Sequence, residues 1–80
     1  MKQEKALEIN NAAVNVYLHK MGVVACSVRD VEIVTKCSTA QIQTASEYVQ
    51  AINLEDNTLR TYISPNSVEI VRKYASTLSV

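Results

Sequence analysis

Apolar residues recur at helical spacing from the start of the chain, and the first such stretch covers residues 3–21. Its wider apolar face contains Leu7, Val14, Tyr17, Leu18 and Met21. Ile9, Ala13 and Val16 form a second, narrower strip at the same period, which is typical of a helix. Gly22 follows where a left-handed residue often ends a helix. The pattern predicts a first helix with two apolar faces.

Two serines mark the starts of the next two helices. Ser27 stands three residues before Asp30, and Ser38 stands three residues before Gln41. Each pair matches a capping box, in which the serine accepts a bond from the N3 N–H and the N3 side chain accepts one from the serine N–H. Helices are therefore predicted over residues 28–36 and 39–52. Two capped helices joined by so short a turn are typical of a helix-turn-helix.

The remaining pattern predicts a little β-structure and a last helix. Residues 23–26 form an apolar run long enough for a brief edge strand or an extended connector. Residues 53–63 contain a turn pair followed by alternating residues, which predicts a short hairpin. Ser64 and Pro65 then suit the N-cap and first position of a helix that ends near Leu78. If the hairpin region were an irregular loop, a four-helix bundle would result instead.

Two stretches carry a resemblance to a known family. SVRDVEIVTKCSTAQIQTASEYV and TYISPNSVEIVRKYA together resemble the bacterial winged helix-turn-helix superfamily, in which a capped scaffold helix, a recognition helix, a wing and a final helix follow one another. The resemblance implies a mainly α single domain over residues 1–80, with a small β-hairpin and the order helix-strand-helix-helix-hairpin-helix. It also implies a sequence-specific DNA-binding regulator of transcription.

The same resemblance implies which residues contact double-stranded DNA. In the family, the outer side of the second helix of the pair enters the major groove. Base edges would then meet Gln41, Gln43 and Thr44, because amides and hydroxyls can bond to bases. Phosphates would be held by Ser38, Thr39, Arg29, Lys36 and Arg60.

Charge weakens the DNA interpretation and favours a homodimer. The chain has eight basic and eight acidic residues, so its formal net charge is zero, whereas phosphate neutralisation carries much of DNA affinity. Two copies would double the small number of cations at the DNA. The apolar residues predicted to form a two-fold interface are Ile9, Ala13, Val16, Ile70 and Tyr74. The alternative is that the small domain covers these residues itself.

A second function class stays open, namely a protein–protein interaction module or adaptor subunit that does not bind DNA. Zero net charge and a recognition face without Arg or Lys suit that class. Convergence of Arg29, Lys36 and Arg60 beside the third helix would favour DNA. Crowding of the same side by the acidic residues would favour the adaptor, and those residues are Glu32, Glu47 and Glu55.

Catalysis and metal binding find little support in the sequence. Cys26, Cys37 and His19 lack Cys-x-x-Cys or His-x-x-x-His spacing, and both thiols suit small buried positions. There is no glycine-rich phosphate loop, so neither an enzyme nor a cofactor is expected. The polar start MKQEKALEIN lacks the apolar segment of a signal peptide, and no apolar run approaches membrane-spanning length. A cytoplasmic location is therefore expected.

Overall fold

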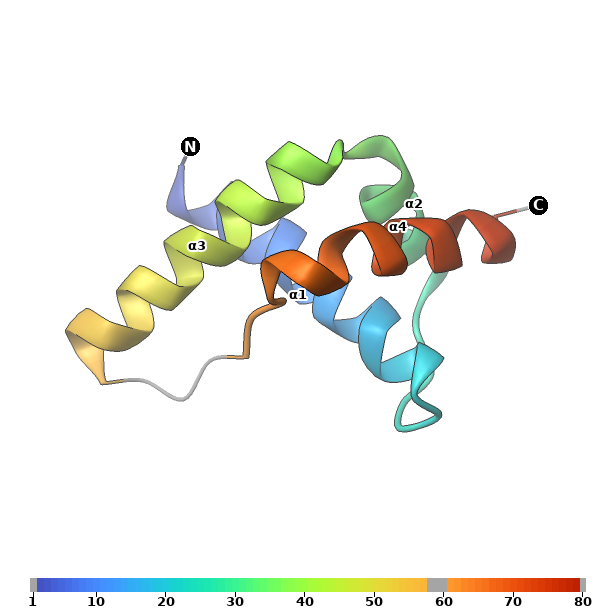
Figure 1. Ribbon diagram of the computed structural model, residues 1–80, viewed down its shortest axis with the longest axis horizontal. Helices are drawn as coiled ribbons and strands as arrows, with labels where there is room; N and C mark the ends of the chain where they lie inside the picture. Colours follow the sequence, from blue (N-terminus) through green and yellow to red (C-terminus); the bar gives the residue numbers. More distant parts are fainter. Residues whose placement is uncertain (1, 58–60, 80) are drawn as a thin grey trace.

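A computed structural model describes residues 2–57 and 61–79 of the chain, and these residues form four helices (Figure 1). The helices are α1 (Gln3–Lys20), α2 (Val28–Lys36), α3 (Thr39–Asp56) and α4 (Pro65–Leu78). Neither described range contains a strand. The predicted winged helix-turn-helix fold, with its edge strand and hairpin, is therefore wrong. Within the described ranges, the arrangement is all-helical.

The starts of α2 and α3 agree with the predicted capping boxes. Ser27 Oγ accepts from the Asp30 N–H at 3.1 Å, and Asp30 Oδ2 accepts from the Ser27 N–H at 3.1 Å. Ser38 Oγ accepts from the Gln41 N–H at 3.1 Å, while Gln41 Oε1 accepts from the Ser38 N–H at 2.7 Å. Each reciprocal pair satisfies N–H groups that have no partner inside the helix. Only Cys37 and Ser38 connect the two helices.

The end of α1 explains why the predicted edge strand is absent. Gly22 adopts a left-handed φ of 77°. Its N–H donates to the His19 carbonyl at 3.0 Å, and the Val23 N–H donates to the Leu18 carbonyl at 2.9 Å, which together make a Schellman motif. The motif uses the first N–H of the apolar run, and the described chain offers no strand beside residues 23–26. The run is an extended connector to α2.

The predicted hairpin is replaced by a longer α3. Residues 53–56, which would have formed the first hairpin strand, continue the helix, and Asn57 ends it in a left-handed conformation with φ of 55°. Asn tolerates this conformation, so the turn residue acts as a helix C-cap. Residues 61–64 are irregular, and their Ile63 side chain is 4% exposed and packs into the core. Residues 58–60, including the candidate Arg60, lie outside the described ranges.

Helix α1 lies at the centre of the packing and contacts α2, α3 and α4. Helix α4 also packs on α2 and α3, and Figure 1 shows α3 and α4 crossing in front of α1. The largest fully buried side chains are Ile9, Ile42, Val16, Val34, Val49, Val68, Val71 and Asn10. Apart from Asn10, these side chains are aliphatic, and burial of each stabilises the fold by about 1.5–3 kcal/mol. The core therefore comes from one face of every helix.

One buried polar cluster crosses this core. Asn10 of α1 is 1% exposed and Ser46 of α3 is 3% exposed. Ser46 Oγ donates to Asn10 Oδ1 at 3.3 Å, and Asn10 Nδ2 donates to the Thr61 carbonyl at 2.9 Å. Buried polar groups are costly unless paired, so these bonds select one position for the segment before α4.

Candidate nucleic-acid interface

The outer side of the first turns of α3 is polar, and its charged residue is Glu47. Ala40, Gln41, Thr44 and Glu47 are exposed, whereas Thr39 and Gln43 are half-buried. The inner side is apolar, with Ile42, Ala45 and Val49 fully buried. The amphipathic pattern thus sets the outer side toward solvent.

Two of the predicted base-contacting side chains already have partners on α3. Gln41 Oε1 belongs to the capping box, so its amide NH₂ is the group left for an outside acceptor. Gln43 Nε2 donates to Glu47 Oε1 at 3.3 Å, which leaves its carbonyl oxygen as an acceptor. Thr44 is exposed on the outer side of α3 and presents both a hydroxyl and a methyl group. The arrangement offers hydrogen bonds and no cation.

A cation absent from the predicted DNA-contacting residues lies at the N-terminal end of α3. Arg72 of α4 is half-buried, and its Nη1 donates to Thr39 Oγ1 at 3.2 Å. Its Nε is buried and has no hydrogen-bond partner within residues 2–57 and 61–79. The N-terminus of a helix carries roughly half a positive charge, so Arg72 adds to an end that already favours anions. The helical period of the sequence does not predict this contact, because Arg72 and Thr39 lie on different helices, 33 positions apart in the chain.

Two other candidate cations, Arg29 and Lys36, lie on α2. Arg29 and Lys36 line a groove between α1 and α2 together with Lys5, Glu8 and Glu32. Arg29 Nη2 forms an ion pair with Glu8 Oε1 at 3.0 Å. Arg29 therefore has an acidic partner on α1, and the groove has mixed charge. Lys36 is exposed in the last turn of α2, two residues before Ser38.

The residues predicted to form a dimer interface differ from one another in their exposure to solvent. Ile9, Ala13 and Val16 are at most 1% exposed and pack within the chain's own core, so they present no surface to a partner. The alternative, that the domain covers these residues itself, holds for all three. Ile70 is 50% exposed, and Tyr74 is half-buried with its ring centroid 5.9 Å from that of His19.

The surroundings of the two cysteine side chains affect the reactivity of their thiols. Burial raises the pKa of the Cys37 thiol, although Lys5 and Arg72 oppose the rise. Burial and the Asp30 carboxylate raise the pKa of the Cys26 thiol. A raised pKa lowers the thiolate fraction and hence reactivity. No group of three or more potential metal ligands occurs within the described ranges.

Comparison with known proteins adds no assignment: no family model, curated protein or solved structure matches the chain. Among the described helices, none combines the length and apolar character needed to cross a membrane.

Proposed function

We propose that this chain binds double-stranded DNA through the outer side and N-terminal end of α3, as a small helix-turn-helix protein without a wing. A role in regulating transcription would follow from sequence-specific binding. The observation that carries the proposal is the position of Arg72, which bonds to Thr39 at the start of α3.

The packing of α2 and α3 on α1 is consistent with the proposal. Helix α1 packs on both α2 and α3, so the short pair is held by a third helix. The core residues of α3 all lie on its inner side, and its first turns remain exposed on the other side. A helix held in this way can enter a major groove, which is wide enough for one α-helix.

The chemistry of α3 supports contacts of two kinds. Arg72, Lys36 and the positive end of the helix suit phosphate oxygens, which position a protein on DNA. Thr44 and the remaining amide groups of Gln41 and Gln43 suit base edges. Because few cations lie at this end of each chain, binding is expected to need two copies.

A binding titration with a random-sequence duplex at several salt concentrations tests the phosphate contacts. The wild-type affinity is expected to fall linearly with salt on logarithmic axes. Arg72→Gln should weaken binding and reduce the slope by about 1, because one phosphate contact is lost. Lys73→Gln is the matched control: Lys73 is the next residue, but it is exposed and pairs with Glu69 on the same helix. Its slope should match that of the wild-type protein.

Because Arg72 is half-buried, the thermal unfolding of each variant is measured in parallel. Equal slopes for two folded variants, Arg72→Gln and Lys73→Gln, would refute the role of Arg72. Absence of binding by the wild-type protein at low salt would refute the proposed function.

A helical protein–protein module is the second candidate, and two contacts favour it. Glu47 lies on the outer side of α3, where it accepts from Gln43, and Glu8 pairs with Arg29, one of the candidate cations. This candidate predicts no salt-dependent affinity for a random duplex. The titration therefore separates the two functions.

A further inference from the structure

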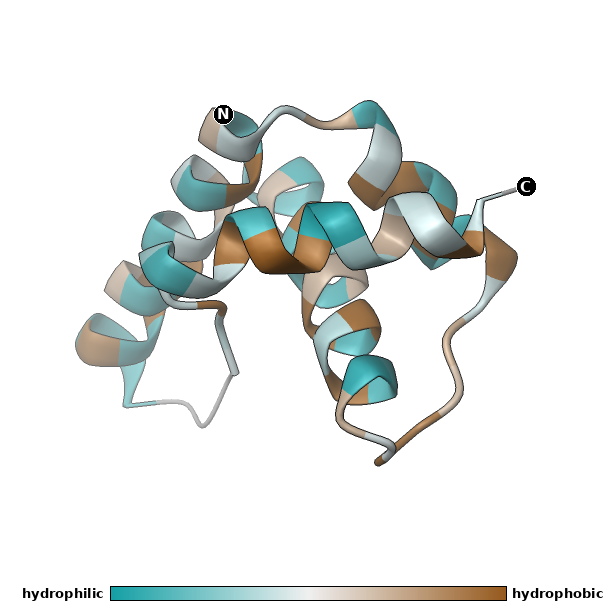
Figure 2. Ribbon diagram, turned by 45° about the vertical axis from the view of Figure 1, so that its right-hand side comes forward, coloured by the Kyte–Doolittle hydropathy of each residue, from teal (hydrophilic) through white to brown (hydrophobic). Residues whose placement is uncertain are grey.

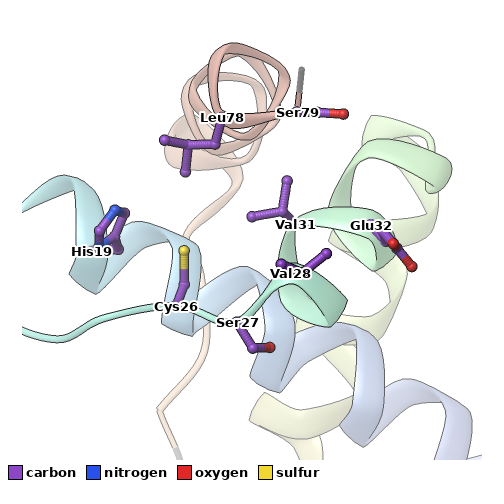
Figure 3. A pocket seen from close by; sticks show the side chains of 8 residues that line it. All are labelled: His19, Cys26, Ser27, Val28, Val31, Glu32, Leu78 and Ser79. Atoms are coloured by element: carbon purple, nitrogen blue, oxygen red, sulfur yellow. The ribbon is translucent and has the colours of Figure 1, made fainter.

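A shallow groove lies at the opposite end of the molecule from the C-terminal end of α3. It is bounded by the C-terminal end of α1, the connector to α2, the start of α2 and the last turn of α4, and its volume is about 430 Å³. The side chains that line it include His19, Cys26, Val28, Val31, Glu32 and Leu78 (Figure 3). None of the lining residues belongs to α3, the helix that carries the side chains proposed to contact bases.

The middle of the groove is apolar and open to solvent. Val28 is 75% exposed at the first position of α2, and Leu78 is 37% exposed in the last turn of α4. Val23 and Val24 of the connector do not line the groove, and they are also exposed, at 65% and 40%. Figure 2 shows hydrophobic colour at the bend of this connector and again at the start of α2. Exposed apolar residues gathered in this way are typical of an interaction surface.

A cation borders one end of the groove, and an acidic residue lines the other end. His19 lies at the α1 end, and its Nδ1 donates to the Val24 carbonyl at 3.0 Å. The next residue, Lys20, is exposed, with its Nζ 5.9 Å from the centroid of the Tyr74 ring. Glu32 is exposed at the α2 end, with the apolar residues between (Figure 3). The charged side chains are thus Lys20 beside one end of the groove and Glu32 in the lining at the other, with apolar side chains between them.

We propose that this groove is the interface between two copies of the chain, related by a two-fold axis. In an isologous interface, residue i contacts residue j and j contacts i. A two-fold axis through the apolar middle places Lys20 against the partner's Glu32 and repeats the contact in the other direction. It also brings Val28 and Leu78 against the same apolar surface of the partner. A surface with both charges at opposite ends is therefore complementary to itself.

The inference deepens the proposed function, which calls for two copies, but it is tested without DNA. Sedimentation equilibrium of the full chain over a wide concentration range is expected to show a reversible dimer of twice the 8.9 kDa chain mass. Val28→Asp should raise the dissociation constant at least about ten-fold, since a charge would be buried in an apolar contact. An acidic residue suits the first turn of a helix, so α2 should still form.

Leu54→Asp is the matched control, because Leu54 is 81% exposed in the last turns of α3 and lies outside the groove. It should leave the dissociation constant unchanged. A charge exchange gives a second measurement that leaves the apolar contact intact. Lys20→Glu and Glu32→Lys should each weaken the dimer, and the double variant should restore much of the affinity, as reciprocal pairing requires.

A wild-type chain that stays monomeric at high concentration would overturn the inference. So would a dimer that Val28→Asp and both charge variants leave intact, or one that only Ile70→Asp disrupts, since the interface would then lie elsewhere. A dimer that fails to bind DNA would instead refute the proposed function and leave this interface standing.

Discussion

The buried contact between Asn10 and Ser46 provides a test of what holds the segment before α4 in place. Asn10 bonds to Ser46 at 3.3 Å and to the Thr61 carbonyl at 2.9 Å, and both side chains are almost fully buried. Asn10→Ala removes both bonds and leaves a small cavity. Each lost bond of this kind costs about 0.5–1.5 kcal/mol, and a buried group left unpaired costs about 1–3 kcal/mol. The variant is therefore expected to lose about 2–4 kcal/mol of unfolding free energy.

A second variant separates the hydrogen bonds from the general effect of altering the core. Asn10→Leu combined with Ser46→Ala removes both partners and keeps an apolar side chain of similar size at Asn10. Replacing both members of a buried polar pair by apolar groups is often close to neutral. The Thr61 carbonyl lies in an exposed residue, so water can replace the lost donor. The double variant should thus be within about 1.5 kcal/mol of wild type.

Urea unfolding followed by far-ultraviolet circular dichroism is the suitable assay, because the chain is largely helical and contains no tryptophan. The free energies of unfolding are compared between variants for which this energy falls with urea concentration at the same slope. Differences between them then report stability alone. If Asn10→Ala cost less than about 1 kcal/mol, the cluster would not contribute as the geometry requires. If the double variant were as unstable as Asn10→Ala, cavity formation would account for the loss.

Two further predictions concern a helix cap and a thiol. Ser38→Ala should lose about 1 kcal/mol in urea unfolding because its capping bonds disappear; Ser64→Ala should lose less, because Ser64 makes no such bond at α4, and equal losses would contradict the assignment. Burial raises the pKa of Cys37 above its ordinary value of 9.0, so above about pH 9 the unfolded chain has lost more protons and stability falls. Cys37→Ala should show a smaller decrease in urea midpoint between about pH 8 and pH 10, and identical decreases would refute this.

Several parts of the candidate interface followed from local patterns. The Ser38–Gln41 pair predicted the start of α3, because a capping box involves only residues within one turn. The inner and outer sides of α3 followed from the helical period, since apolar side chains must share the side that faces the core. The exposed position of Thr44 is one result of that pattern.

Other parts depended on contacts between distant segments. A hairpin over residues 53–63 matches the local alternation, but a strand needs a paired neighbour to satisfy its backbone groups. Continuation of α3 to Asp56 satisfies those groups within the helix. Ile9, Ala13 and Val16 formed a strip that could have faced a partner; whether a partner or the same chain covers them depends on how three other helices pack around α1.

The sequence by itself therefore determined where the four helices begin, that Ser27 and Ser38 cap α2 and α3, and which sides are apolar, since these depend on neighbours within a turn or two. Only the tertiary structure decided that no wing forms in the described chain, that Arg72 reaches the start of α3, and that an apolar groove stays open beside Val28. The physical reason is that each of these results depends on free energy gained between segments far apart in the chain. A local pattern is compatible with several such arrangements, and packing selects one of them.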